Sequence, residues 1–393
     1  MKNIIASIIY KLDCFVPKNK NQIAFSSFPD ISDNCYGMFR YLFRLDKNFK
    51  FIWLLSNDSN IGQYKEMISK DMLLNEVDFN RIFFIKKNSI QGIYYYLRSK
   101  YVFFTHGLYP EVKFSKDHIL INLWHGMPLK KIALLDNINN KKIPIFSFTI
   151  ATSIFFQEYM AKAFGVPLNN VMVSGQPRND LLFEDNNCLQ LLGIDKTFYK
   201  KIFLWTPTYR QSMIGDIRMD GHSSDGLPII DKDYKNLNES LRTIDSYMII
   251  KLHPMDILNQ NRFDKYSNIL FLTNDDLEKR HCQLYLLLNN IDVLITDFSS
   301  IYIDFLLLDR PIGFATEDFD EYFTSRGFIM EHPKEYMPGS FIASQDELFN
   351  FLKNCTEDKD NYKEKRHQVN NLFNDKKRSF SQRLWIEVLE SEK

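Results

Sequence analysis

The chain has 393 residues, more than one ordinary hydrophobic core holds, so two domains are expected. Lysine plus arginine and aspartate plus glutamate balance at 49 each, which leaves no global charge that would indicate nucleic-acid binding. Hydrophobic residues make up 45% and charged residues 25%, as is typical of a globular protein.

The N-terminal segment, MKNIIASIIYKLDCF, resembles a signal peptide only superficially, because Tyr10 and Lys11 interrupt its short apolar run and no small-residue cleavage site follows. No apolar segment of the sequence is long enough to span a bilayer. An amphipathic helix is expected instead, docked on its own domain or lying on a membrane surface. Lysines gather in the first third of the chain, which indicates a basic face, although separately solvated lysines explain the same pattern.

The five cysteines are scattered, and no two of them have the spacing of metal ligands. We therefore expect no disulfide framework, no metal site and a reducing cytoplasmic compartment. The cysteines are Cys14, Cys35, Cys188, Cys282 and Cys355.

The first half alternates short apolar runs with segments of helical periodicity. Helices are predicted over residues 35–45 and 64–74. Strands are predicted over residues 23–27, 51–55, 81–85, 101–105, 119–123, 148–151 and 171–173.

A polar run at 184–187 interrupts this pattern and indicates a domain boundary, which gives domains of residues 1–189 and 190–393, with the last helix able to pack back on the first domain. The segment 213–227 is rich in Gly, Ser and Asp and is predicted to be a mobile loop. Further strands are predicted over residues 202–205, 247–252, 269–272, 293–295 and 312–314.

Strands separated by helices predict an α/β fold of two Rossmann-like domains that face a central cleft. Ligands of such folds bind at the carboxyl ends of the strands. The polar motifs of this chain should therefore follow its strands, and they do.

The most informative stretch, DVLITDFSSIYIDFLLLDRP, covers residues 292–311. An apolar strand leads into a polar turn, and a helix follows over residues 301–308 and ends near Pro311. Strand, polar turn and helix is a layout that presents backbone N–H groups to a phosphate. Helix capping explains the same residues equally well. The candidate ligand-binding residues are Thr296, Asp297, Ser299, Ser300 and Asp304.

Two histidines follow strands of the first half. His125 lies in NLWHGMPLKK, where Gly126 and Pro128 predict a tight turn that exposes the imidazole. A histidine in that position can act as a general base near neutral pH. His106, in THG, competes for this role, and a structural histidine is the plainer alternative for either.

Three further motifs carry cations or imidazoles after strands. In SGQPRND, Arg178 could clamp phosphate or could pair with Asp180 to close a turn. In the second half, WTPTYR brings Thr208 and Arg210, and KLHP brings His253. A doubly wound sheet brings these last residues together with the turn at 296–300, and their convergence indicates a diphosphate site.

At this point the motifs WHGMPLKK, SGQPRNDLL, WTPTYR, KLHP, LITDFSSIYIDFLLLDRPIGF and EYMPG resemble, in order, those of the CDP-glycerol glycerophosphotransferase family. The resemblance covers roughly residues 23–352. It implies a GT-B fold, a CDP-alditol donor with CMP as product, functional roles for His125 and His253, and peripheral attachment at the cytoplasmic face of a membrane. Met127 stands where the family commonly has Thr, and Phe298 where it commonly has Tyr.

The expected reaction is the attack of an acceptor hydroxyl on the phosphorus that bears the alditol. We expect His125 to be the base, and Arg210, His253 and the amides at Ser299 and Ser300 to hold the diphosphate. The expected acceptor is lipid-linked or a polysaccharide, in teichoic acid or capsule synthesis, and no metal or cofactor is required. The alternatives are ribitol phosphate transfer, a UDP-sugar glycosyltransferase or epimerase on the same scaffold, and a non-catalytic nucleotide-binding protein.

Overall fold

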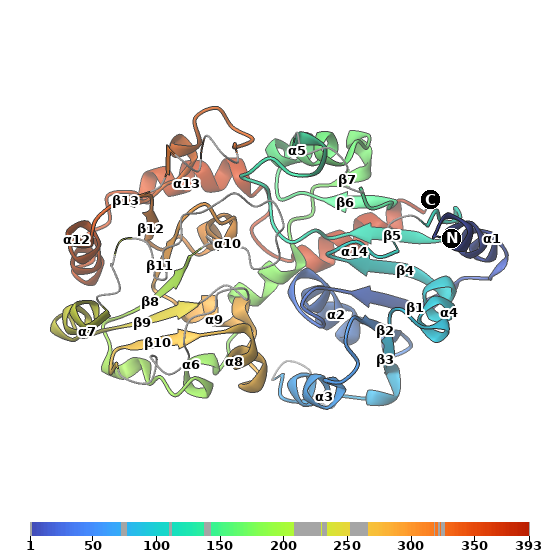
Figure 1. Ribbon diagram of the computed structural model, residues 1–393, viewed down its shortest axis with the longest axis horizontal. Helices are drawn as coiled ribbons and strands as arrows, with labels where there is room; N and C mark the ends of the chain where they lie inside the picture. The colour runs from blue at the N-terminus through green and yellow to red at the C-terminus, as the bar shows by residue number, and fades with distance from the viewer. Residues whose placement is uncertain are drawn as a thin grey trace. The chain divides into compact units, whose positions relative to one another are not determined.

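The computed structural model describes residues 2–71, 77–109, 112–136, 143–207, 229, 234–251, 266–317, 319–320, 323 and 327–392. The chain divides into two compact units. Unit 1 comprises residues 1–127, 132–183 and 374–393, and unit 2 comprises residues 128–131 and 184–373. Each unit is built on its own parallel sheet with helices packed against it (Figure 1).

Unit 1 has a seven-stranded sheet in the order β3-β2-β1-β4-β5-β6-β7, and every neighbouring pair is parallel. The chain works outward from β1 to one edge and then returns to continue from β4, so the direction of winding reverses between β1 and β4. The strands are β1 (Asn19–Ser26), β2 (Lys50–Leu55), β3 (Ile82–Lys86), β4 (Ser99–Phe104), β5 (Ile119–Asn122), β6 (Phe148–Ile150) and β7 (Val171–Met172).

Unit 2 repeats this plan with six parallel strands in the order β10-β9-β8-β11-β12-β13. This is the Rossmann order, with the reversal between β8 and β11. The strands are β8 (Lys201–Thr206), β9 (Ser246–Lys251), β10 (Ile269–Leu272), β11 (Val293–Thr296), β12 (Ile312–Ala315) and β13 (Ser340–Ile342).

Aromatic residues on alternate strand positions build one core of unit 1. Phe25 on β1 stacks between Trp53 on β2 and Phe103 on β4, with ring centroids 5.0 and 5.5 Å away. Trp385 packs against this face from α14 (Phe380–Glu390), so the end of the chain belongs to unit 1. The helices α2 (Asp33–Leu45) and α3 (Ile61–Ser69) cover the same face.

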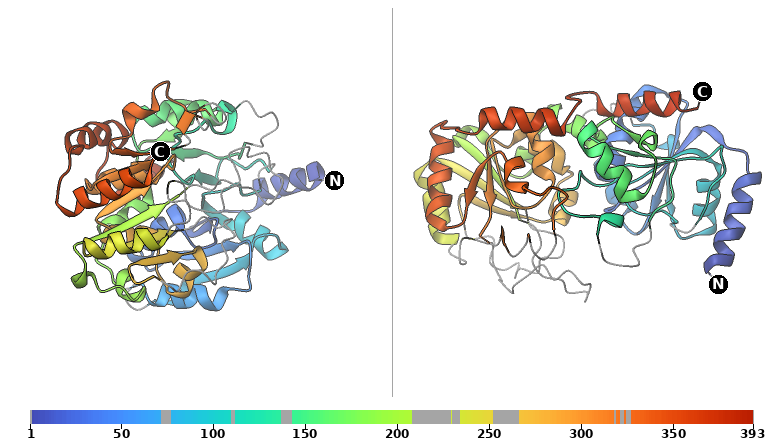
Figure 2. Two further views of the ribbon diagram at one scale, coloured as in Figure 1. Left: turned by 60° about the vertical axis from the view of Figure 1, so that its left-hand side comes forward. Right: turned by 90° about the horizontal axis from the view of Figure 1, so that it is seen from above.

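The opposite face of this sheet carries α4 (Ile90–Arg98), because Gln22, which points away from Phe25, donates a hydrogen bond to the carbonyl of Tyr95. Unit 1 also holds α1 (Lys2–Phe15) and α5 (Ile154–Phe164) (Figure 2).

In unit 2, α7 (Tyr234–Thr243) and α12 (Gln345–Thr356) share one core with alternate residues of β8, β9 and β11. The other helices of the described part are α6 (Cys188–Leu191), α8 (Asn274–Lys279), α9 (Leu284–Asn290), α10 (Ile301–Phe305) and α13 (Lys363–Phe373).

The predicted α/β class with two Rossmann-like domains is confirmed, and each of the twelve predicted strands is present to within a few residues. The sequence missed β13, which has three residues at the sheet edge and too little apolar pattern to stand out. The boundary between the units in the sequence lies between residues 183 and 184, and residues 374–393 belong to unit 1. The predicted loop at 213–227 lies outside the described residues. Among the described helices, none has the length and apolar character needed to cross a membrane.

Candidate active site

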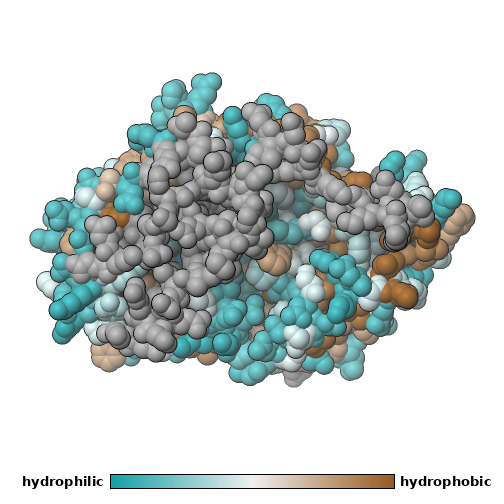
Figure 3. All heavy atoms as spheres, viewed as in Figure 1, coloured by the Kyte–Doolittle hydropathy of each residue, from teal (hydrophilic) through white to brown (hydrophobic). Residues whose placement is uncertain are grey.

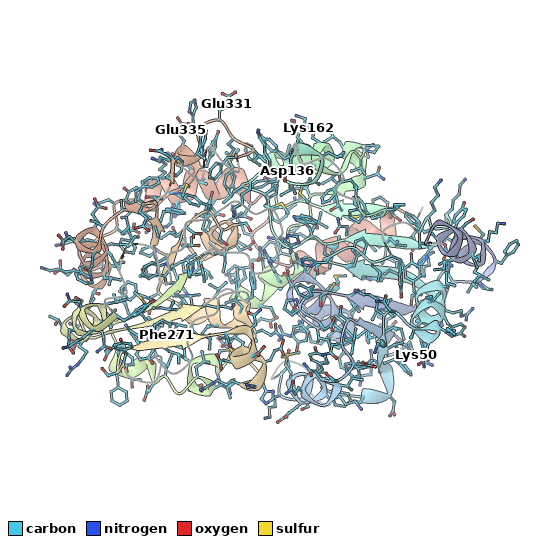
Figure 4. All side chains as sticks on the ribbon, in the orientation of Figure 1. Lys50, Asp136, Lys162, Phe271, Glu331 and Glu335 are labelled. Atoms are coloured by element: carbon cyan, nitrogen blue, oxygen red, sulfur yellow. The ribbon has the colours of Figure 1, made fainter. Side chains whose placement is uncertain are left out.

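Polar side chains gather at the carboxyl edge of each sheet, where the winding reverses. In unit 1 these side chains follow β1, β4 and β5, and in unit 2 they follow β8 and β11. Lys50, labelled in Figure 4, begins β2 and so marks the opposite, amino edge of the unit 1 sheet. Ligands of doubly wound sheets bind at the edge where the polar groups lie.

His125 lies in the turn that follows β5, and its side chain is exposed. Its ring stacks on that of His106, which follows β4, with centroids 4.5 Å apart and planes 13° apart. The ring of Trp124 lies 4.0 Å away. Gly126 has φ 142°, which favours glycine, and this turn keeps the imidazole at the surface. The two histidines that competed for the base role thus form one pair.

A buried asparagine and a buried arginine hold this turn by its backbone. The Nδ2 of Asn34 donates to the carbonyls of Leu123 and Trp124, each at 3.2 Å. The Nη1 of Arg178 donates to the carbonyl of His125 at 3.1 Å and lies 2.6 Å from Oδ1 of Asp33. The backbone of three consecutive residues before Gly126 is therefore fixed from the side.

Both anchors come from α2 and the segment after β7, which pack tightly on each other. A Cβ at Gly37 on α2 would lie 2.5 Å from the carbonyl oxygen of Pro177, so only glycine permits this approach. Asn34 also accepts a hydrogen bond from the backbone N–H of Arg178 at 3.2 Å. Asn34 and Arg178 together join the start of α2 to the turn that bears His125.

Arg178 pairs with a residue other than Asp180, the partner that one of the two alternatives named. It pairs with Asp33, whereas Asp180 accepts the N–H groups of Phe380 and Ser381, each at 2.9 Å, at the start of α14. Arg178 is only 5% exposed, so the predicted phosphate clamp would have to act from a buried position.

Backbone strain concentrates around the same turn. Ile31, Asp33 and Trp124 all have φ between 51° and 59°, a region that residues other than glycine rarely adopt. Such conformations persist only where the surrounding structure fixes them, and they cluster at functional sites. This observation supports a functional reading of the histidine pair.

The surroundings of His125 favour its neutral form. Burial by the surrounding protein lowers the pKa of His125, and the adjacent His106 lowers it further, whereas Asp33 opposes the shift. Burial likewise lowers the pKa of His106. Since the ring of His125 keeps an exposed surface, solvent moderates the desolvation. A neutral imidazole at neutral pH can accept a proton.

The unit 2 site lies at the ends of β8 and β11. The hydroxyl of Thr206 donates to that of Thr296 at 3.2 Å, and Thr296 donates to the carbonyl of Thr206 at 3.1 Å. This pairing locks the two strand ends together and buries Thr296. Asp297 is fully buried directly after β11.

Ser299 and Ser300 are half-buried at the start of α10. The hydroxyl of Ser300 makes no cap hydrogen bond to the helix, and Ser299 accepts only a long one, 3.5 Å, from the N–H of Ile301. Capping thus accounts for these serines only weakly, which leaves their hydroxyls able to meet a ligand. The predicted helix over residues 301–308 is α10 followed by a 3-10 turn over Leu306–Leu308.

Asp304 lies on α10, inside unit 2. It is fully buried, and its Oδ2 accepts the hydroxyl of Tyr285 at 2.6 Å, which ties α10 to α9. The predicted contact of Asp304 with a ribose stays a prediction. Arg310, at the end of the same stretch, donates to the carbonyls of Asn289 and Ile291 and caps α9.

Thr208, Arg210 and His253 lie outside the described residues, and their roles stay predictions. The residues before them are described: Thr206 ends β8, and Lys251 ends the neighbouring strand β9. Sequence reasoning missed Asp33 and Asn34. They resemble ordinary cap residues before a helix, and only their contacts with a segment far along the chain reveal their role.

Comparison with known proteins finds relatives over nearly the whole chain. The sequence model of the family described as CDP-glycerol:poly(glycerophosphate) glycerophosphotransferase matches residues 8–388. The teichoic acid poly(ribitol-phosphate) polymerase of Bacillus spizizenii is 25% identical over 379 residues, covering 90% of this chain and 58% of that protein. The teichoic acid poly(glycerol phosphate) polymerase of the same species is 26% identical, covering 88% of this chain and 86% of that protein.

Among solved structures, that of the wall teichoic acid polymerase TagF matches with a TM-score of 0.76 and 22% identity. The match covers 100% of this chain and 93% of the other, and it shows a shared two-domain, Rossmann-like fold. The chain spans little more than half the length of the ribitol-phosphate polymerase that it matches.

Proposed function

The chain belongs to the CDP-glycerol:poly(glycerophosphate) glycerophosphotransferase family, and we propose that it transfers an alditol phosphate from a CDP-alditol to an acceptor hydroxyl and releases CMP. The single observation that carries this proposal is His125. It is an exposed imidazole with a lowered pKa, at the carboxyl edge of a Rossmann-like sheet, on a turn that buried Asn34 and Arg178 hold in place.

In the proposed step the acceptor hydroxyl attacks the phosphorus that bears the alditol. A P–O bond forms to the acceptor, the P–O bond to CMP breaks, and the hydroxyl proton passes to Nδ1 or Nε2 of His125. His106, stacked on His125, disfavours the protonated form of its neighbour, so His125 returns its proton readily before the next cycle.

Unit 2 is proposed to bind the donor. The serine hydroxyls and N–H groups at Ser299 and Ser300 would face the diphosphate, joined by the side chains of Thr208, Arg210 and His253. Positive charge there compensates the charge that develops on departing CMP. No cofactor and no metal enter this proposal.

Both alditols are represented among the relatives, one named for ribitol phosphate and one for glycerol phosphate. We propose CDP-glycerol as the donor and CDP-ribitol as the alternative. The proposed acceptor is a lipid-linked or glycan hydroxyl in teichoic acid or capsule synthesis, reached by peripheral attachment at the cytoplasmic face of the membrane.

A donor screen tests the proposal. The full chain is incubated with CDP-glycerol, CDP-ribitol and a UDP-sugar, with glycerol phosphate-primed lipid as the acceptor, and released nucleotide is measured. CMP release that depends on acceptor, and that is lost in His125→Ala, is the expected result. UDP release alone would assign the chain to the glycosyltransferase alternative. Donor binding without turnover on any acceptor would favour a non-catalytic protein.

A further inference from the structure

An exposed aromatic ring lies beside the histidine pair of unit 1. Phe28, in the loop of residues 27–32 that follows β1, is 62% exposed. Its ring meets that of His106 edge to face, with centroids 5.6 Å apart and planes 68° apart. Because His106 stacks on His125, Phe28 lies one ring beyond the imidazole that is proposed to act as the base. This position suits contact with the part of a substrate next to its reacting group.

Exposure alone assigns no role to this ring. Single apolar side chains are common on protein surfaces, and Figure 3 shows brown residues scattered among hydrophilic ones on the face in view. Phe198 is an example in unit 2, because it is 75% exposed and precedes β8, on the amino side of that strand. Phe28 differs in that its exposed ring contacts His106 and is carried by a firmly held loop.

The loop that carries Phe28 is held by hydrogen bonds that do not involve the ring. The hydroxyl of Ser32 donates to the carbonyl of Pro29 at 2.6 Å. The buried carboxylate of Asp30 accepts the backbone N–H of Ser56 with both oxygens, at 3.0 and 2.9 Å, and so ties this loop to the one after β2. A ring on an ordered loop loses little conformational freedom when a substrate packs on it.

A cation from another strand end comes close to the same imidazole. Lys87 directly follows β3, and the hydroxyl of Tyr109, in the loop after β4, donates to its carbonyl oxygen. Burial lowers the pKa of His106, Asp33 opposes this shift, and the ammonium of Lys87 adds to it. The Nζ of Lys87 donates to the neutral hydroxyl of Ser56 at 3.3 Å. The loops after β1, β2, β3 and β4 thus gather around His106.

Two acids at this sheet edge have basic partners of their own. Asp33 pairs with Arg178 at 2.6 Å, and Asp58 pairs with Lys86 at 3.3 Å. In the described part of this edge, the ammonium of Lys87 donates to a hydroxyl instead. Its charge can therefore be offered to an anionic group that approaches the histidine pair.

We propose that Phe28 and Lys87 form the subsite for the acceptor in unit 1. The ring of Phe28 packs against the C–H groups of the acceptor's terminal polyol unit, and the ammonium of Lys87 binds a phosphate group of the acceptor chain. The electron-rich face of an aromatic ring suits C–H groups that neighbouring hydroxyls polarise. These two contacts direct the acceptor hydroxyl toward His125. The inference rests on the proposed function, because it takes His125 as the base that meets the acceptor.

Steady-state CMP release by the full chain tests the subsite, with CDP-glycerol as donor and a soluble trimer of glycerol phosphate as acceptor. The test variants are Phe28→Ala and Lys87→Ala, and Phe28→Tyr restores the ring. The matched controls are Phe198→Ala and Lys50→Ala, which remove an exposed ring before β8 and an exposed lysine at the start of β2.

Phe28→Ala should raise the KM of the acceptor about 2- to 12-fold, and Phe28→Tyr should keep it near the parent value. Lys87→Ala should raise this KM about 2- to 5-fold and should also weaken its dependence on salt, which Phe28→Ala should leave as in the parent. For both test variants, kcat at saturating acceptor and the KM of CDP-glycerol should match those of the parent. The controls should match the parent in every measurement.

An unchanged acceptor KM in Phe28→Ala or in Lys87→Ala would overturn the proposal. A lower kcat of Phe28→Ala with a shifted pH profile would also overturn it, because the ring would then act only by positioning His106.

Titration of the trimer into the full chain without donor, followed by saturation-transfer NMR, separates the subsite from the reaction. If the trimer binds with the expected order of affinities and no protein releases CMP, the subsite stands and the proposed function fails. If CMP release is normal and all variants bind the trimer equally, the subsite fails and the proposed function stands. No binding and no CMP release by the parent would overturn both.

Discussion

Replacing His125 by alanine should abolish most turnover while leaving the fold intact. Removing a general base slows such a reaction by about two to four orders of magnitude. The ring is exposed and makes ring contacts with His106 and Trp124, so its loss should cost at most about 0.5–1.5 kcal/mol per contact. For a unit of this size the melting temperature should then fall by only a few degrees, at roughly 2–4 °C per kcal/mol. Donor affinity should be unchanged.

His118 provides the contrasting control. It is fully buried, its Nδ1 lies 2.8 Å from Asp13, and its ring centroid lies 4.7 Å from that of Tyr96. His118→Ala should lower the free energy of unfolding by about 3–5 kcal/mol, as expected when a buried polar pair is broken, with kcat nearly unchanged at low temperature. The assay is CMP release at saturating donor, with melting curves and donor titration for each variant. A large drop in the melting temperature of His125→Ala, or normal turnover at saturation, would refute the assignment of His125 as base.

Three further predictions concern the pH profile, the proposed donor site and the packing of α2. The surroundings of His125 lower its pKa, so the base should stay neutral as the pH falls from 7 to 6.5. In a pH profile of kcat/KM, the loss of activity on the acid side should therefore begin below pH 6.5. A loss that begins above pH 7 would contradict this. His253→Ala should weaken donor binding about 10- to 150-fold, measured by calorimetry with CDP, and an unchanged affinity would remove His253 from the donor site. Gly37→Ala should destabilise the protein by about 1–3 kcal/mol, because the added Cβ meets the Pro177 carbonyl, whereas Gly62→Ala, with open space around it, should not.

The layout of the fold was readable from the sequence because parallel strands buried on both faces are nearly continuous apolar runs. The runs at 51–55 and 293–295 have this form, and each is a strand. The strand Ser340–Ile342 lacks it: it lies at the sheet edge with Phe341 partly exposed, so neighbours rather than local pattern decide its conformation.

The site was readable only where local geometry decides it. A histidine between a strand and a Gly-containing turn predicts exposure, and His125 is exposed. Burial in the interior depends on packing far along the chain, so the hydrogen bond that Asp304 accepts from Tyr285 could not be read from the sequence. The same reason hides Asn34, whose partners in the turn lie 89 and 90 residues away.

The doubled Rossmann order supplies the link between these motifs and one reaction. In each unit the winding reverses between the first and fourth strands, so the turns after those two strands start at the same edge however far apart they are in sequence. In unit 1 this rule brings His106 after β4 toward the loop after β1, and the edge contact of its ring with Phe28, at 5.6 Å, shows that it does. In unit 2 it brings Thr206 to Thr296, 90 residues later. Arg210 follows β8, which pairs with β11, and His253 follows β9, which pairs with the other side of β8. The topology of the described strands is therefore the reason to expect a cation and an imidazole at the same sheet edge as Ser299 and Ser300.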